Sequence, residues 1–287
     1  MKWSAFTDAV EYLQATAKAF DKAAARLPAD RQKLKHSAFE INMIAETLKN
    51  SQKFYLPGDL NLIAGKEYTT LIPLMRLPFK TIALLSEIPI NNVTGQVLTI
   101  AFELPEDQKQ TVNDWVIIYS LIKPPGHDWD VCAAGIKLAK SEDRIEMYAM
   151  ETPMSLHISQ AWKQFGQDPL TSFNEAKTDV DRLSNLCVML ALKNVRPQID
   201  EPPPKLNKKR AASGKLPLYA YHVLEVDGEV WGPHSKGDGS AEYRSHLRRG
   251  HIRRLSDGRA VWVRATYVHG RMPGFVSKDY AVKEPTV

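Results

Sequence analysis

The stretch Val97-Leu98-Thr99-Ile100-Ala101-Phe102 decides the fold class, because its branched and aromatic side chains are typical of a buried β-strand. Three further runs of this kind occur at residues 81–85, 116–119 and 145–150. Turn-forming residues separate the runs, as in Pro124-Pro125-Gly126 between the third and the fourth. This spacing predicts a central antiparallel sheet, built as a meander of four or five strands.

Helical patterns lie on both sides of the predicted sheet. Residues 3–27 place an apolar residue at alternating steps of three and four, which predicts an amphipathic helix with Ser4 as its N-cap. Leu27-Pro28-Ala29-Asp30 ends this helix and begins a second one, so the two are expected to form a hairpin. Helical patterns return near residues 155–165 and, more strongly, at 180–195. The fold class predicted from these elements is α+β.

The charge of the chain divides unevenly along its length. Residues 196–287 hold 17 Lys and Arg against 10 Asp and Glu, whereas residues 1–195 hold 21 against 23. A basic end of this kind is typical of a chain that meets a polyanion or an acidic surface. Residues 196–213 contain three consecutive prolines and several lysines, which predicts an extended linker. We therefore expect an α+β body at 1–195, a linker at 196–213 and a small basic C-terminal module at 214–287.

The composition indicates a globular protein of a reducing compartment. Apolar residues make up 44% of the chain and charged residues 25%, and no apolar run is long enough to span a bilayer. The N-terminus shows no secretory signal, and Cys132 and Cys187 lie among apolar neighbours, as reduced cysteines commonly do. These features predict a cytoplasmic protein with no disulfide and no membrane partner.

The basic module carries the clearest local signal. Residues 251–268 contain Asp257-Gly258 between two apolar and arginine-rich runs, which predicts a β-hairpin with a tight turn. Before it, residues 218–226 predict a strand and residues 241–249 a short helix that ends at Gly250. The module is therefore expected to be a small domain that contains a basic hairpin.

The side chains of this hairpin point to binding of an anionic partner. Strand alternation places Trp262, Arg264 and Thr266 on one surface, opposite a core face that includes Val261. Guanidinium groups bind phosphate or carboxylate oxygens in pairs and stack on aromatic rings, so this surface suits single-stranded RNA or an acidic peptide. An alternative is an edge hairpin whose arginines block aggregation. The predicted RNA-binding or partner-binding residues are Arg244, His246, Arg248, Arg249, His251, Arg253, Arg254, Arg259, Trp262 and Arg264.

Two histidines in the module raise an enzymatic alternative. His246 and His251 lie beside an arginine cluster, and such a pair can act as acid and base in phosphodiester cleavage. No carboxylate except Glu242 is near them in sequence to orient an imidazole, and they lack the second ligand pair that zinc requires. The prediction is a binding protein with no catalytic residues, no metal and no cofactor, with a histidine-dependent ribonuclease as the alternative.

A sequence motif in the module resembles the basic module of the type V anti-CRISPR family. The motif consists of His246, Arg248, Arg249, Gly250 and His251, followed downstream by Val263-Arg264. Related phage and plasmid proteins carry similar modules. In that family the inhibitor binds the N-terminal peptide of the CRISPR effector nuclease as it is translated and causes loss of its messenger RNA.

The resemblance implies a protein of mobile-element origin that evades host defence by translation-coupled loss of a target's messenger RNA. Its expected partners are the nascent polypeptide of a CRISPR effector or of another host protein, together with RNA or the ribosome. The body would hold the peptide and the module would contact RNA. A plain RNA-binding regulator without peptide specificity is the alternative from the residues alone.

Overall fold

In the computed structural model, residues 2–56, 72, 75–90, 93–104, 114–132, 134–141, 144–151, 169–226, 244–248, 251–263, 266–268 and 272–276 are described. The chain divides into two compact units. Unit 1 comprises Met1–Ala191 and Pro197–Glu225, and unit 2 comprises Leu192–Arg196 and Val226–Val287. Among the described residues, no helix is long and apolar enough to cross a membrane.

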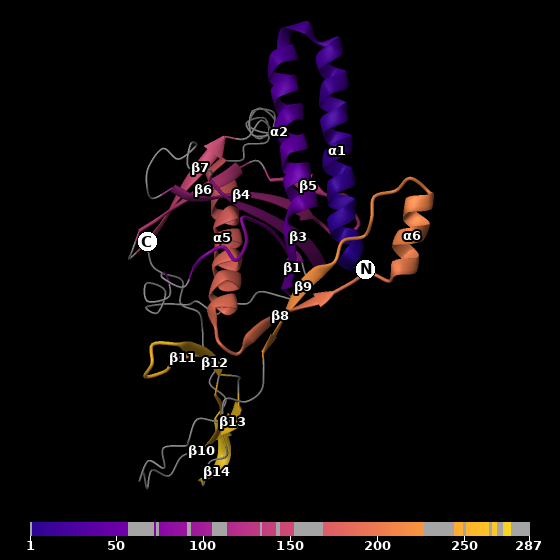
Figure 1. Cartoon of the computed structure of the whole chain (residues 1–287). Helices are drawn as coiled ribbons and strands as arrows, with labels where there is room; N and C mark the ends of the chain where they lie inside the picture. The colour runs from indigo at the N-terminus through magenta and orange to yellow at the C-terminus, as the bar shows by residue number, and fades with distance from the viewer. Residues whose placement is uncertain are drawn as a thin grey trace. The chain divides into compact units, whose positions relative to one another are not determined.

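A mixed β-sheet forms the centre of unit 1 (Figure 1). Among the described residues it has nine strands, in the order β7-β6-β4-β3-β2-β1-β9-β8, with β5 paired to β4. The predicted meander is confirmed, because β2, β3, β4, β6 and β7 pair with their neighbours antiparallel. The strands of the meander and the short β5 are β2 (Thr81–Ile90), β3 (Val93–Glu103), β4 (Asp114–Lys123), β5 (Asp130–Val131), β6 (Ala134–Lys140) and β7 (Ile145–Glu151).

Two strands that the prediction did not place in the body make the sheet mixed. β1 (Gln52–Leu56) pairs parallel with β2, and β9 (Tyr221–Val226) pairs parallel with β1. The sequence-based boundary assigned β9 to the C-terminal module, and the structure differs. Tyr221 explains why: its ring packs 6.2 Å from that of Phe6 and 6.0 Å from that of Tyr55, and its hydroxyl donates to Asp200.

The helical hairpin predicted at the N-terminus is confirmed and covers one face of the sheet. It consists of α1 (Lys2–Arg26), a 3-10 turn η1 (Pro28–Asp30) and α2 (Arg31–Asn50). Ser4 lies inside α1 and is not its N-cap, because the helix already includes Lys2.

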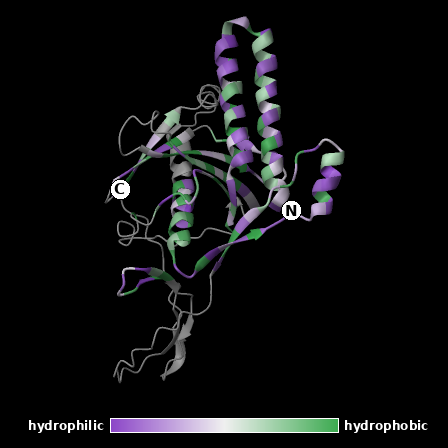
Figure 2. Ribbon diagram, in the orientation of Figure 1, coloured by the Kyte–Doolittle hydropathy of each residue, from purple (hydrophilic) through white to green (hydrophobic). Residues whose placement is uncertain are grey.

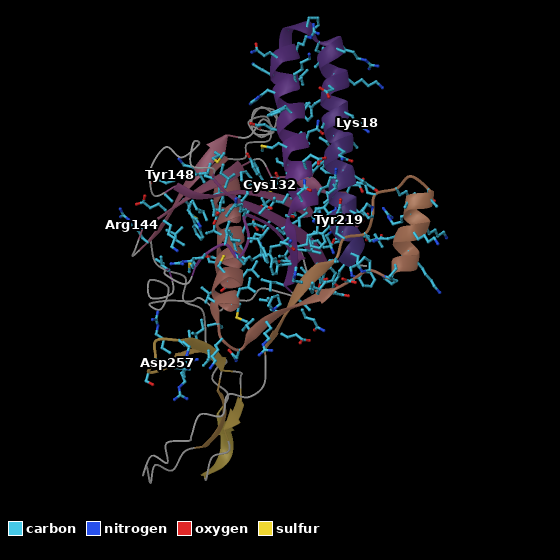
Figure 3. The ribbon with its side chains drawn as sticks, viewed as in Figure 1. Lys18, Cys132, Arg144, Tyr148, Tyr219 and Asp257 are labelled. Atoms are coloured by element: carbon cyan, nitrogen blue, oxygen red, sulfur yellow. The ribbon has the colours of Figure 1, made fainter. Side chains whose placement is uncertain are left out.

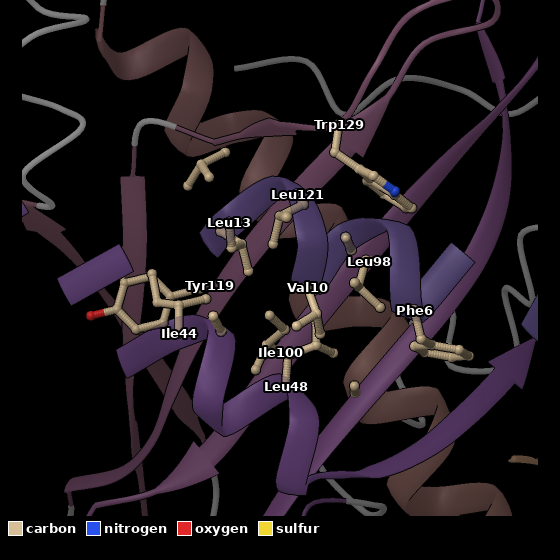
Figure 4. Close-up of a cluster of buried hydrophobic side chains, with 14 of the residues drawn as sticks. Phe6, Val10, Leu13, Ile44, Leu48, Leu98, Ile100, Tyr119, Leu121 and Trp129 are labelled. Atoms are coloured by element: carbon tan, nitrogen blue, oxygen red, sulfur yellow. The ribbon is translucent and has the colours of Figure 1, made fainter. Parts of the chain in front are cut away.

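The core of unit 1 lies between this hairpin and the sheet, where apolar side chains of both helices meet Leu98, Ile100 and Leu121 (Figure 4). Phe6, Leu13, Leu98, Ile100 and Leu121 are fully buried. Each such side chain contributes roughly 1.5–3 kcal/mol of hydrophobic stabilisation. The apolar stripe of the helices therefore holds the hairpin on the sheet.

Helix α5 (Pro169–Ala191) packs against β3, β4 and β6. Thr99 lies between Leu98 and Ile100 in β3, and successive strand residues point to opposite faces. Since Thr99 bonds to Asp179 of α5, this helix covers the face of the sheet opposite the helical hairpin. The predicted helix at 180–195 is confirmed as far as Ala191, and the predicted helix at 155–165 lies outside the described residues.

The structure corrects the prediction of an extended linker at 196–213. This segment contains the strand β8 (Val195–Asp200), which pairs with β9, and the helix α6 (Pro204–Ala212). Proline is favoured at the first position of a helix, so Pro204 begins α6 where the proline run ends. The α6 helix ends in a Schellman motif, in which the amides of Gly214 and Lys215 bond to the carbonyls of Ala211 and Arg210. Gly214 supplies the required positive φ of 64°.

Unit 2 contains two small sheets. β11 (His251–Arg254) pairs antiparallel with β12 (Ala260–Val263), while β10 (Arg244–Arg248) pairs with β13 (Thr266–Val268) and β14 (Met272–Val276). The hairpin around Asp257-Gly258 is confirmed. The predicted helix at 241–249 is wrong over 244–248, because β13 and β14 supply backbone partners to an extended β10. The predicted long strand at 260–268 is divided between the two sheets.

A buried lysine of unit 1 joins β1 to α2 and to the segment that precedes β9. Lys53 in β1 is 4% exposed, and its ammonium group donates to the carbonyls of Lys49 and Ser51, each at 3.0 Å. The ammonium group also lies 4.3 Å from the ring centroid of Tyr219, which is labelled in Figure 3. Because the Lys49 carbonyl belongs to the last turn of α2, Lys53 compensates the negative end of that helix. Burial lowers the pKa of Lys53 to about 8.

We predict that Lys53 makes the stability of the protein rise with pH. Its pKa is about 8 in the folded protein against an ordinary value of 10.5, so between these values the unfolded chain binds the proton more tightly. The free energy of unfolding should therefore rise by about 2 kcal/mol between about pH 7.5 and 9.5 from this group. Urea unfolding of the wild type and of Lys53→Met at both pH values measures the difference. Equal pH dependence in the two proteins would contradict the assignment.

Candidate polyanion-binding surface

The described part of the predicted site is the β11–β12 hairpin of unit 2. The register places Arg253 opposite Val261 and Arg254 opposite Ala260. Residues directly opposite in an antiparallel pair share a face, so the two arginines lie on different faces of the hairpin. Val261 and Ala260 are 2% and 7% exposed, whereas both arginines are exposed. The hairpin therefore buries small apolar residues of β12 and exposes the arginines of β11.

The turn of the hairpin is held by its own charges. The Asp257 carboxylate accepts from the Arg259 backbone amide at 3.1 Å and from the Arg259 guanidinium. These interactions lower the pKa of Asp257 to about 2, so the carboxylate stays ionised. Gly258 adopts a φ of 80°, which favours glycine at this position. Figure 3 labels Asp257 at this turn.

The ion pair at the turn leaves the rest of the hairpin basic. The one carboxylate between residues 251 and 263 is that of Asp257, and Arg259 compensates it. Arg253 and Arg254 carry further positive charge, and both are exposed. Lys193, whose amide donates to the Ala260 carbonyl at 3.1 Å, adds another exposed cation within unit 2. The described hairpin thus has a net positive surface on a backbone fixed by hydrogen bonds.

The other predicted site residues are placed by their backbone or lie outside the described part. Arg244, His246 and Arg248 are in β10, His251 is in β11 and Trp262 is in β12; the side chains of these five residues are outside the described part, as are all atoms of Arg249 and Arg264.

The proposed histidine pair is divided between two sheets. His246 pairs with Val268 and Val276, and His251 pairs with Val263. The two histidines are close in sequence, but they belong to different strands with separate hydrogen-bonded ladders. The ribonuclease alternative stays a prediction.

A buried polar cluster in unit 1 also has unusual electrostatics. Asp179 and Arg182 of α5 are 5% and 9% exposed, and their side chains meet at 2.7 Å. The Asp179 carboxylate also accepts hydrogen bonds from Ser120 and, at 3.4 Å, from Thr99. Burial raises the pKa of Asp179, while the hydroxyls and the guanidinium oppose that rise. Perturbed carboxylates occur in functional sites and in structural ion pairs alike.

The surroundings of Asp179 favour a structural role. Thr99 and Ser120 are directly paired across β3 and β4, and both are nearly fully buried under α5. The cluster therefore fixes the position of α5 on the sheet, because it gives hydrogen-bond and ion-pair partners to polar groups whose burial without partners would be unfavourable. Strand alternation places Thr99 on the face opposite Leu98 and Ile100, but no local pattern indicates its partner Asp179, which is 80 residues away in the chain.

Both cysteines are thiols in the structure. Cys187 in α5 is 1% exposed, and burial raises its pKa to about 12, so it is a packing residue of low reactivity. Among the described residues, no group of three or more His, Cys, Asp or Glu side chains is arranged to hold a metal ion.

Comparison of the chain with protein-family models, with curated proteins and with solved structures gives no match. The resemblance to the anti-CRISPR family therefore stays a prediction.

We predict that Arg182→Met destabilises the protein by about 3–5 kcal/mol, because it leaves the Asp179 carboxylate buried without its cation. Adding Asp179→Asn should recover a large part of the loss, since the amide keeps a hydrogen-bonding group and removes the charge. Urea unfolding of the two single variants and the double variant measures the coupling. A double variant no more stable than Arg182→Met alone would show that the ion pair is not what holds α5.

Proposed function

We propose that this protein is a cytoplasmic RNA-binding protein whose β11–β12 hairpin contacts phosphate groups. The observation that carries the proposal is the charge arrangement of the hairpin. Arg259 neutralises its only carboxylate, while Arg253 and Arg254 remain exposed. Arginine offers several fixed donors to phosphate oxygens, and a hydrogen-bonded hairpin holds their Cα positions before binding.

RNA is favoured over double-stranded DNA by the geometry of the hairpin. Exposed arginines on both faces of a short two-stranded ribbon suit a flexible single strand that can bend around it. A single patch aimed into a groove would instead place its cations on one face. Trp262, whose backbone pairs with Ile252 in the hairpin, is proposed as a stacking residue for an unpaired base.

We predict that Arg253→Gln/Arg254→Gln lowers the affinity for an unstructured 20-nucleotide RNA at least tenfold at low salt. The slope of log affinity against log salt should fall by about 1.4, since each phosphate contact on a single strand contributes about 0.7. Fluorescence anisotropy across a salt series measures both quantities.

The matched control for this experiment is Arg26→Gln/Arg31→Gln, which removes the same charge from exposed positions of the helical hairpin. It should bind nearly as the wild type does. If the control loses as much affinity as the hairpin variant, net charge alone accounts for binding and the hairpin is not the site.

Peptide recognition by the body is the second candidate function, in keeping with the resemblance to the type V anti-CRISPR family. The observation that favours it is the position of β7 at one end of the strand order, with β6 as its one described neighbour. An outer strand can receive an extended peptide by main-chain hydrogen bonding. Tyr148 of β7, 46% exposed, offers a side chain to such a peptide.

If silencing is coupled to translation, cells that express this protein should lose the transcript of a type V effector whose start codon is intact. A transcript with a mutated start codon should keep its level. The physical reason is that the protein would bind the nascent peptide, which an untranslated message does not produce. Quantitative measurement of intact and start-codon-mutated transcripts tests this. Equal levels of the two transcripts would contradict recognition of that effector's nascent peptide, and RNA binding would stand as the proposed function.

A further inference from the structure

Helix α6 of unit 1 has two faces of different character. Residues three or four apart lie on the same side of a helix, so Lys205, Lys208 and Lys209 share one face, and Asn207 and Arg210 lie on the other. All three lysines are exposed. In Figure 2 the helix is drawn largely in purple, the colour of hydrophilic residues. We call the side formed by Lys205, Lys208 and Lys209 the lysine face.

The side opposite the lysine face holds α6 in place. The Asn207 amide donates to the Leu218 carbonyl at 3.0 Å, and its oxygen accepts from the Leu218 amide at 2.7 Å. The Arg210 guanidinium donates to the Leu216 carbonyl at 2.6 Å and to Glu11 of α1 at 3.2 Å. The Schellman motif at Gly214 fixes the C-terminal end. These contacts set the orientation of the lysine face with respect to α1 and β9.

The stability of the helix explains only part of the lysine face, since Lys209 lies in the last turn, where the helix dipole favours a cation. Lys205 lies in the first turn, where the positive end of the helix dipole disfavours a cation. Lys205 and Lys209 are spaced at four residues, and like charges at this spacing destabilise a helix. Among the ion pairs of the described residues, none involves these lysines. A polyanion would relieve the repulsion that the free protein leaves in place.

We propose that the lysine face of α6 is a second RNA-binding surface, carried by unit 1, that contacts phosphate groups. This inference depends on the proposed function in that RNA is the ligand, but it concerns different residues in a different unit. Membrane-surface helices insert a broad apolar face. The non-lysine side of α6 is instead occupied by the contacts of Asn207 and Arg210, and that argues for a phosphate backbone over a lipid surface.

The test is the full-length variant Lys205→Gln/Lys208→Gln/Lys209→Gln, because glutamine keeps helix propensity and removes charge. We expect at least a fivefold loss of affinity for the unstructured RNA. The slope of log affinity against log salt should fall by about 2, corresponding to three phosphate contacts. The matched control, Lys18→Gln/Lys22→Gln/Lys33→Gln, removes three exposed lysines from the helical hairpin of the same unit. The variant with arginine at all three α6 positions should keep wild-type binding.

The outcomes separate this inference from the proposed function. If the α6 variant binds RNA as its control does while Arg253→Gln/Arg254→Gln loses binding, the lysine face is not a site and the hairpin assignment stands. If the α6 variant loses binding and the hairpin variant does not, the lysine face is the site and the hairpin assignment fails. Binding to vesicles of phosphatidylserine that depends on the three lysines, with unchanged RNA binding, overturns the inference in favour of a membrane. Unchanged circular dichroism confirms that each variant is folded.

Discussion

Burial of both faces of β3 and β4 is the constraint on which the rest of unit 1 depends. Leu98 and Ile100 face the α1–α2 hairpin, and Thr99 between them faces α5. One face of the strand is apolar and the other carries a hydroxyl, so the two faces need different packing partners. The apolar stripe of the helical hairpin packs on the first face. The Asp179–Arg182 pair of α5 meets the hydroxyl on the second. Without either cover, backbone and side-chain groups at the centre of the sheet would meet water.

Parallel pairing of β1 with β9 brings Tyr221–Val226 beside the N-terminal part of the chain. Tyr221 of β9 packs on Phe6 of α1 and Tyr55 of β1, and Thr7 donates to the Pro217 carbonyl at 2.7 Å. These contacts place the segment that contains α6 beside the first helix. As a consequence, a run of lysines that would be a solvated linker in isolation becomes an oriented surface. Two elements with a net positive charge, α6 and the β11–β12 hairpin, therefore contribute no residue to the hydrophobic core between the helical hairpin and the sheet.

The elements that sequence reasoning predicted well are those with a strong local period. The two N-terminal helices follow from their apolar stripes, and the hairpin at Asp257-Gly258 follows from a turn that needs a residue with positive φ. Helix α6 was missed although its local signals were present: Pro204 at the first position and Gly214 two residues past the end. The proline run outweighed them, since prolines in series are also typical of an extended segment. Strand β10 was missed because its partners β13 and β14 follow later in the chain and leave no mark within residues 244–248.

By itself, the sequence determined the α+β class, the helical hairpin, the antiparallel meander and the basic character of the C-terminal third, because each depends on periodicity, turn chemistry or charge within a short window. Only the tertiary structure decided that β9 belongs to the body, that the Asp179 carboxylate meets Thr99, and that Lys53 caps α2 beneath Tyr219. These pairings join residues far apart in the chain, and their free energy comes from burial and from hydrogen bonds between distant groups. A local pattern shows that a residue will be buried, but not which distant residue it will meet.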